Sequence, residues 1–322
     1  MNPLFIFILK ALRKSYTKIL GGYSLPALKR EENPDKISEI IYNLLSGDKP
    51  CMIARFGANE LNAIINYLGV NSQSHSIWKF IKGEQPEWWW NKKIMYHMQN
   101  NAGFFPATPN YMQRFGELMI NDSKEIDLLA SWMKDEYYID KFLSPQTKKV
   151  NRECCNPFFT NQPWTKALKR KKVLVIHPFS ESIKSQYKNK EKLFTNPDIL
   201  PDFELYTIQA VQSIGGINKF EDWFKALEWM KTEMDKITYD ICLIGCGAYG
   251  LPLAAHAKRK GKKAVHLGGS LQLLFGIKGA RWENPKYNSK YNYASLMNQY
   301  WIKPSKEERP NNANQVENGC YW

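Results

Sequence analysis

Several features that would assign a sequence to a class at once are absent from this chain. None of its apolar runs reaches the ~18–20 residues that a membrane-spanning helix needs. No internal repeat and no low-complexity block is visible. The five histidines are not paired with cysteines at ligand spacing, which argues against structural zinc.

Cysteine is scarce and is not arranged for cross-linking. The six cysteines form no CxxC pair, and the adjacent Cys154 and Cys155 make a poor disulfide framework. Cys51 and Cys242 lie inside apolar runs and are predicted to be buried thiols. This pattern favours a reducing, cytoplasmic compartment.

The chain is rich in apolar side chains and in positive charge. Of its 322 residues, 43% are hydrophobic and 14% are aromatic, so a sizeable core can form and global disorder is excluded. The 45 lysines and arginines outnumber the 31 acidic residues, which gives a net charge of +14. A surplus of that size indicates one of three partners: nucleic acid, an anionic membrane surface, or a phosphate-bearing small molecule.

The first 30 residues form a segment with six basic residues and no acidic one. Apolar side chains recur in it at helical spacing, namely Phe5, Ile8, Leu9, Leu12, Tyr16 and Ile19. Most of the charges fall on the other side, namely Lys10, Arg13, Lys14 and Lys18. The pattern predicts a helix over residues 1–20 that either lies in an anionic membrane interface or docks its apolar stripe on the domain. A signal peptide fits less well, because the charges follow the apolar run.

Between residues 31 and 150 the pattern is mainly helical. Asn33-Pro34 has the form of an N-cap followed by proline at the first helical position. A short apolar strand is expected at Cys51–Ala54, with a helix after it. The stretch from about 76 to 150, with Trp88-Trp89-Trp90, is predicted to be an aromatic helical insertion. The three tryptophans could stack on a sugar ring or a base, but such clusters more often belong to a core or a membrane-facing belt.

From residue 172 onwards, strands and helices alternate. Apolar strands are expected at 173–176, 203–208, 241–244 and 264–267, with helices at 219–236, 249–260 and 270–276. Such a series predicts an α/β fold, a Rossmann-like and mostly parallel sheet with helices on both faces. The chain is therefore divided into a basic segment (1–30), one α/β domain (31–302) and a loose polar tail (303–322).

The first of two glycine-rich turns in this part of the chain is suited to binding phosphate. Gly245–Gly250 reads G-x-G-x-x-G, follows a buried strand and opens a helix, so the backbone at Gly245, Gly247, Ala248 and Tyr249 can approach a phosphate. No acidic residue lies ~20 positions further on, where Gly268 and its neighbours stand. This disfavours NAD and S-adenosylmethionine and favours a mononucleotide or a nucleotide sugar. The alternative is a turn that packs tightly and binds no ligand.

Two further strand ends carry polar side chains. His177 ends one strand, and Ser180 and Lys184 follow in the first turns of a helix, where hydroxyls and a lysine suit a diphosphate. His177 could equally be a structural histidine. The other strand end continues into a loop and the start of a helix, with Arg55, Gly57, Asn59 and Glu60.

Arg55 and Glu60 are the two charged groups of that second strand end. An arginine can hold a phosphate by two parallel hydrogen bonds. Glu60 could be a metal ligand or a base, or simply a first-turn acid that suits the helix dipole. Nucleic acid is not expected as a partner, because the basic runs Lys169–Lys172 and Lys258–Lys263 contain no RNA- or DNA-binding module.

Taken together, these motifs resemble the GT-D-fold glycosyltransferases, in particular the GT-D-like proteins of bacterial surface-polysaccharide gene clusters. The resemblance covers roughly residues 35–285. It rests on four short stretches in this order: Arg55–Glu60, Asn101–Pro106, Lys172–Phe179 with Gln186-Tyr187, and Gly245–Gly250 with His266–Gly269.

The resemblance implies transfer of a sugar from a nucleotide-sugar donor to a hydroxyl of a lipid-linked or protein-linked glycan, at the inner face of the plasma membrane. The donor diphosphate would lie between the three strand ends, with Glu60 as the catalytic base. Two other functions stay open. One is a catalytically degenerate relative that binds or holds other assembly enzymes, and the other is a different nucleotide-dependent transferase, such as a methyltransferase.

The family's metal motif is matched only in part. In better-known members the first strand end reads R-x-G-D-G-E, and its acids bind a divalent metal at the donor diphosphate. Here Ala58 stands at the aspartate position and Asn59 replaces the following glycine, so only Glu60 carries over. The resemblance therefore implies Mn²⁺ or Mg²⁺ at Glu60, although one carboxylate is a weak site for either ion.

Overall fold

The centre of the molecule is a seven-stranded sheet in which all neighbouring strands are parallel. The computed structural model describes residues 1–213, 219–310, 313 and 319–322. The strands are β1 (Cys51–Ala54), β2 (Leu128–Ser131), β3 (Lys148–Asn151), β4 (Lys172–His177), β5 (Glu204–Gln209), β6 (Ile241–Ile244) and β7 (Lys263–His266). Their order across the sheet is β3-β2-β1-β7-β6-β4-β5. The predicted α/β fold with a parallel, Rossmann-like sheet is confirmed.

The central strands are buried on both faces because nearly every position in them is apolar. Successive side chains point to opposite faces, so each strand contributes to two separate clusters. Val173 of β4 and Ile241 of β6 are paired in register and belong to one cluster. Leu174 and Cys242 are the next pair, and they belong to the other cluster.

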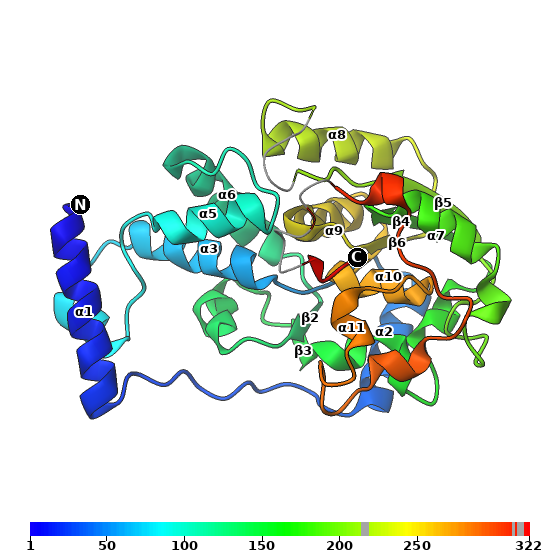
Figure 1. Cartoon of the computed structure of the whole chain (residues 1–322), viewed down its shortest axis with the longest axis horizontal. Helices are drawn as coiled ribbons and strands as arrows, with labels where there is room; N and C mark the ends of the chain where they lie inside the picture. Colours follow the sequence, from blue (N-terminus) through cyan, green and yellow to red (C-terminus); the bar gives the residue numbers. More distant parts are fainter. Residues whose placement is uncertain (214–218, 311–312, 314–318) are drawn as a thin grey trace.

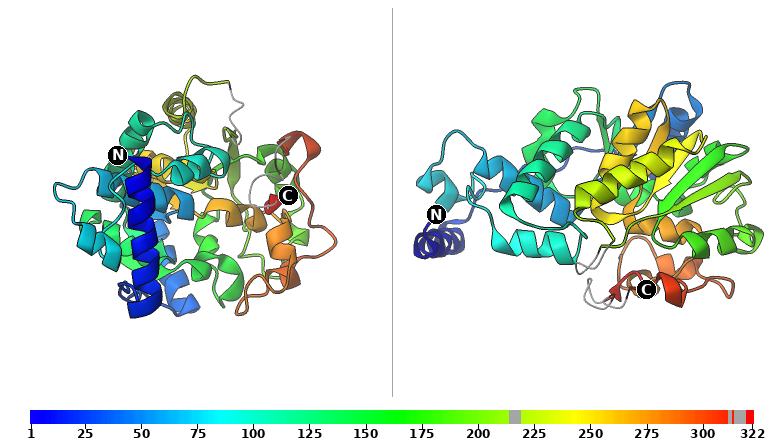
Figure 2. Two further views of the ribbon diagram at one scale, coloured as in Figure 1. Left: turned by 60° about the vertical axis from the view of Figure 1, so that its left-hand side comes forward. Right: turned by 90° about the horizontal axis from the view of Figure 1, so that it is seen from above.

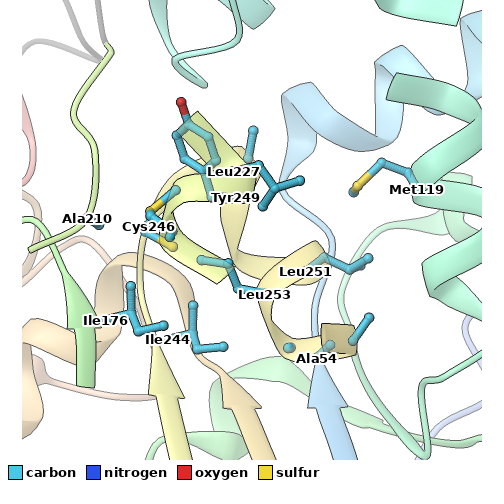
Figure 3. Close-up of a cluster of buried hydrophobic side chains, with 14 of the residues drawn as sticks. Ala54, Met119, Ile176, Ala210, Leu227, Ile244, Cys246, Tyr249, Leu251 and Leu253 are labelled. Carbon is cyan, nitrogen blue, oxygen red and sulfur yellow. The ribbon is translucent and has the colours of Figure 1, made fainter. Parts of the chain in front are cut away.

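Helices cover both faces of this sheet, as Figures 1 and 2 show. On one face the core includes residues of α2 (Pro34–Ser46), α7 (Ser180–Tyr187), α10 (Leu271–Leu274) and α11 (Ala280–Glu283). On the other face it includes residues of α3 (Ala58–Val70), α5 (Lys92–Asn100), α6 (Pro109–Ser123), α8 (Trp223–Asp235) and α9 (Gly250–Arg259). In Figure 3, Leu251 and Leu253 of α9 lie over the strand ends that carry Ala54, Ile176 and Ile244.

Short 3₁₀ helices occupy many of the connections. They are η1 (Lys134–Phe142), η2 (Arg152–Cys155), η3 (Pro157–Phe159), η4 (Trp164–Leu168), η5 (Lys190–Lys192), η6 (Gly247–Tyr249), η7 (Gly268–Ser270), η8 (Tyr293–Leu296) and η9 (Lys306–Glu308). All six cysteines lie in the described chain, and each is a buried free thiol, as expected for Cys51 and Cys242.

The N-terminal helix α1 (Pro3–Leu20) stands at one end of the molecule (Figure 1) and packs on α4 (Ile77–Lys82). A small cluster holds it there, made of Leu9, Phe80 and Trp89, with Ile6 and Trp88 packed against it. Two of the three consecutive tryptophans therefore serve as the docking point of α1. Among the residues that the structure describes, none of the helices combines the length and apolar character that a bilayer crossing needs.

The stretch from residue 76 to 150 is less uniform than the sequence predicts. It contains α4, α5 and α6, but also β2 and β3, which extend the sheet to one of its edges. The sequence of β3, K-K-V-N, is polar, and Val150 is its one fully buried residue. On the outer side of β3, Val150 forms a parallel bridge with Glu31. The helical insertion therefore ends before β2.

The C-terminal tail is not loose where the structure describes it, which corrects the expectation for residues 303–322. Glu308, Cys320 and Trp322 are buried. Just before the tail, a parallel bridge joins Ile302 to Ile277. The tail packs because the rings of Tyr321 and Trp322 contact those of Trp282 and Phe179. The carboxylate of Glu308 also accepts hydrogen bonds from the start of α7.

Candidate active site

A cavity of about 430 Å³ opens at the carboxyl edge of the sheet, where the ends of parallel strands meet. All seven strands of the described sheet supply lining residues, either with their last residue or just after it. In chain order these are Arg55 (β1), Trp132 (β2), Arg152 (β3), His177 (β4), Val211 to Ser213 (β5), Gly245 (β6) and His266 (β7). The sheet topology thus brings together residues that are far apart in the sequence.

The loop after β1 places one carboxylate in the cavity wall. Glu60 lies in the first turn of α3, where a negative charge suits the helix dipole, and is 8% exposed. Its carboxylate packs directly on Gly57, since a Cβ added at Gly57 would lie 1.9 Å from Glu60 Oε2. Only glycine at position 57 leaves room for this placement of Glu60.

Two arginines lie against the same tryptophan. The guanidinium carbon of Arg152 is 4.0 Å from the centre of the Trp132 ring, and that of Arg55 is 5.4 Å from it. Trp132 is itself fixed, because its Nε1 donates a hydrogen bond of 2.9 Å to the carbonyl of Phe56. Burial, and then the charge of Arg152, lower the pKa of Arg55 below its ordinary value.

The two histidines of the cavity are neutral. Burial lowers the pKa of His177 to about 3, and burial followed by the charge of Arg55 does the same for His266. His177 Nδ1 accepts a hydrogen bond of 3.0 Å from the Phe179 amide. The proton of the neutral His177 ring is therefore on Nε2, which makes that atom a hydrogen-bond donor.

The glycine-rich turn both lines the cavity and packs the core. Gly245 and Gly247 line the cavity. The ring of Tyr249 stacks on Trp223 with centres 4.9 Å apart, and its hydroxyl is 3.1 Å from the Ser213 hydroxyl. Tight packing thus describes Tyr249, and phosphate binding at Gly245 and Gly247 stays a prediction.

Comparison with known families bears on the larger part of this site. Residues 144–274 match the GT-D-like family, described as a GT-D fold-like domain. This part of the chain is GT-D-like. The resemblance expected from the sequence is confirmed from β3 to α10, and this region has a glycosyltransferase-like fold.

Other comparisons add little to the GT-D-like assignment. No curated protein matches the chain. One solved structure that matches is titled "Selenomethionine substituted structure of domain of unknown function 1792 (DUF1792)" and is 12% identical. The match covers 91% of this chain and 98% of that one, at a TM-score of 0.35. A likeness at that score carries no argument about this chain.

Most of the site residues predicted from the sequence line the cavity. They are Arg55, Gly57, Asn59, Glu60, His177, Gly245, Gly247, Tyr249 and Gly268. Three others do not line it, namely Ser180, Lys184 and Ala248. Ala248 is buried beneath the turn, while Lys184 is half exposed and pairs with Glu181 at 2.7 Å.

The expected phosphate position at the start of α7 is filled by the protein itself. The Glu181 amide donates to Glu308 Oε1 at 2.7 Å, and the Ser182 amide donates to Glu308 Oε2 at 3.2 Å. A carboxylate from the tail therefore takes the place that an anion would occupy at this helix N-terminus. This arrangement speaks against the diphosphate that the sequence predicts beside Ser180 and Lys184.

Several lining residues were not found from the sequence. Trp132 and Arg152 follow β2 and β3, the two strands that the sequence pattern missed, so strand-end reasoning could not reach them. Arg281 and Tyr321 come from α11 and the tail and reach the cavity only through tertiary packing. No local signal marks either of them.

The residues of the cavity do not fit a divalent metal ion. Outside the three gaps in the described chain, no three histidine, cysteine, aspartate or glutamate side chains gather closely enough to hold one. The Ala58 side chain has no atom that could bind a metal beside Glu60. The negative charge of Glu60 already stabilises the protonated form of Arg55. Three arginines line the same cavity and would repel a cation.

Proposed function

We propose that this protein transfers a sugar from a nucleotide-sugar donor to a hydroxyl of a lipid-linked or protein-linked glycan in bacterial surface-polysaccharide synthesis. One observation carries the proposal: a GT-D-like region places its strand ends around a cavity whose described lining includes three guanidinium groups and one carboxylate. Its volume of about 430 Å³ lies within the range of ligand pockets.

The donor fits against the side of the cavity formed by Gly245, Gly247 and His177, with its diphosphate toward Arg55. Glycine lets the backbone approach a phosphate closely, and the Nε2 proton of His177 is a donor that carries no charge. Arg55 lines the same cavity, and a guanidinium can form two parallel hydrogen bonds to a phosphate.

Glu60 is the proposed general base. In the reaction the acceptor oxygen forms a bond to the anomeric carbon, while the bond between that carbon and the diphosphate oxygen breaks. The hydroxyl proton passes to the Glu60 carboxylate, and the nucleoside diphosphate leaves with the electron pair of the broken bond. The positive charge of the arginines stabilises the leaving diphosphate.

Replacement of Glu60 tests this role. We expect Glu60→Gln to lower the transfer rate by about 100-fold or more, because the amide cannot accept the proton. Donor binding should be retained in a thermal-shift screen of UDP-, GDP-, CMP- and dTDP-sugars, followed by product analysis. Glu39→Gln, at an exposed glutamate of α2, is the matched control. Full activity of Glu60→Gln would remove Glu60 from the mechanism.

A binding protein without catalytic activity is the second candidate, and Ala58 is the observation that favours it. The family's aspartate is missing at that position and Asn59 replaces the glycine after it, although Arg55, Gly57 and Glu60 are present. The same screen separates the two functions. A scaffold shows no stabilisation by any nucleotide sugar and no product, whereas a transferase shows both.

The exposed face of α1 supports a location at a membrane surface. The helix docks through Leu9, and it leaves apolar side chains uncovered, namely Leu4, Phe5, Phe7, Ile8, Leu12, Ile19 and Leu20. Lys14 and Lys18 are also exposed on α1. Apolar side chains next to lysines suit the interface of an anionic bilayer.

Vesicle flotation tests the membrane proposal. A variant with Phe7→Ser, Ile8→Ser and Leu12→Ser should bind vesicles that contain phosphatidylglycerol at least about tenfold more weakly than the wild type. Trp229→Ser, at an exposed tryptophan of α8, should bind like the wild type. Equal binding of the triple variant and the wild type would rule out α1 as the membrane contact.

A further inference from the structure

We propose that Arg55, Arg152 and Arg281 bind the two phosphates of the donor directly, in place of a metal ion. This inference rests on the proposed function and names the groups that recognise its substrate. The three side chains come from the ends of β1 and β3 and from α11, and all of them line the cavity. Arg152 and Arg281 are not part of any motif visible in the sequence.

The charge of the cavity calls for an anionic ligand. Among the described residues, three arginines line it against one acidic side chain, Glu60, and the two histidines are neutral. Glu153 lines the adjoining smaller cavity and pairs with Arg152. Arg55 has an unsatisfied donor that a ligand could meet, because its Nε is buried with no hydrogen-bond partner among the described residues. A buried donor of that kind lowers stability until an acceptor reaches it.

The three guanidinium groups are held in place before any ligand arrives. Arg152 lies on the ring of Trp132, and its Nε donates to Glu153 Oε1 at 3.1 Å. Arg281 lies 5.0 Å from the centre of the Tyr321 ring. Groups fixed in this way lose little side-chain entropy on binding, so their hydrogen bonds contribute fully to affinity.

Arg55 is fixed by the backbone around it. Its Nη2 donates to the Phe56 carbonyl at 3.1 Å. Its Nη1 lies so close to Gly268 that a Cβ there would be 2.5 Å away, and Gly268 has a φ of +66° that disfavours other residues. The glycine after β7 therefore leaves the space in which the Arg55 side chain lies.

The position of the arginines also indicates where the phosphates lie. A second, smaller cavity of about 40 Å³ adjoins the first, and Arg55, Arg152 and Arg281 line both. The small cavity is too narrow for a sugar or a base. The two phosphates are therefore placed where the cavities meet, and the nucleoside and the sugar extend into the larger one.

The planar guanidinium suits this task better than an isolated charge. Each arginine can present two parallel hydrogen bonds to phosphate oxygens, which fixes the direction of the diphosphate as well as its charge. Arg55 and Arg281, together with Arg152 beside its partner Glu153, bring three guanidinium groups to the diphosphate. Catalysis by this site should then need no added metal.

Calorimetry of the full chain with inorganic pyrophosphate tests the inference without using transfer activity. In the presence of EDTA we expect saturable binding, with an affinity that changes by less than about twofold when Mn²⁺ replaces EDTA. Arg152→Ala and Arg281→Ala should each weaken binding by about 10- to 100-fold. Arg152→Lys and Arg281→Lys keep the charge but lose the paired hydrogen bonds, so they should bind with intermediate affinity.

Arg114→Ala is the matched control, because Arg114 also lies over an aromatic ring, that of Phe224, but does not line the cavity. It should bind pyrophosphate like the wild type. Binding that appears only with Mn²⁺, or alanine variants that bind as tightly as the wild type, would overturn the inference while leaving sugar transfer possible. Metal-free, arginine-dependent binding in a protein that transfers no sugar would support the inference and count against the proposed function alone.

Discussion

At the scale of single residues, the placement of Glu60 depends on the absence of a side chain at position 57. Gly57 has φ −77° and ψ 154°, a conformation open to any residue, so the glycine is not required by the backbone. It is required by space, since the Glu60 carboxylate occupies the position of a Cβ. This separates the effect of a substitution on the site from its effect on folding.

Gly57→Ala should therefore displace Glu60 without unfolding the protein. We expect the transfer rate to fall at least about tenfold, while the free energy of unfolding changes by less than about 1 kcal/mol. Rates of product formation and urea unfolding measure the two quantities. Gly47→Ala, at a glycine of similar φ that follows α2, is the control and should keep full activity. An active Gly57→Ala enzyme would show that the position of Glu60 is not critical.

At the scale of elements, the sequence predicts β1, β4, β5, β6 and β7, and it misses β2 and β3 at one side of the sheet. Cys51–Ala54 and Ile241–Ile244 have the bounds expected from their apolar runs. β3 has a single buried apolar side chain, so hydrophobic patterning could not mark it. Arg55 and His177 were found as site residues because the strands before them were predicted. Arg152 was missed because β3 was not predicted.

The contact between Glu308 and α7 shows a second limit of local patterns. Ser180, Ser182 and Lys184 at a helix start are typical of an anion site, and an anion does lie there. The anion is a carboxylate more than 100 residues further along the chain, in a tail whose composition suggests disorder. Local sequence can indicate that a helix N-terminus will be capped, but not which group will cap it.

At the scale of the whole molecule, part of the positive charge surplus is used to hold the fold together. Lys258 pairs with Asp127 at 2.8 Å, and Arg259 pairs with the buried Asp122 at 2.6 Å, so this basic run is not free to bind a partner. The charge that remains for partners includes the cavity arginines and the lysines of α1. The cavity arginines are the proposed site for phosphate, and the lysines of α1 are the proposed site for the membrane surface.

The buried titratable groups also give the whole molecule a dependence on pH. His177 and His266 each have a pKa of about 3 in the folded chain and an ordinary value of 6.5. Below pH 6.5 the unfolded chain binds protons that the folded chain does not, so the stability present above pH 6.5 is lost as the pH falls toward 3. Burial raises the pKa of Asp122 from its ordinary 3.8 to about 6. The effect of Asp122 on stability is therefore opposite to that of the histidines, because its protonation adds stability as the pH falls from 6 toward 3.8.

Urea unfolding at pH 7 and pH 5 can separate these opposing contributions. Each histidine should lower the free energy of unfolding by about 2 kcal/mol over that interval, and Asp122 should restore about 1 kcal/mol. In His266→Gln the loss of stability from pH 7 to pH 5 should shrink by about 2 kcal/mol. In Asp122→Asn it should grow by about 1 kcal/mol, because the compensating group is gone. If the loss were the same in His266→Gln as in the wild type, the neutral, buried state of His266 would be wrong. The assignment of the cavity's positive charge to the three arginines alone would then have to be revised.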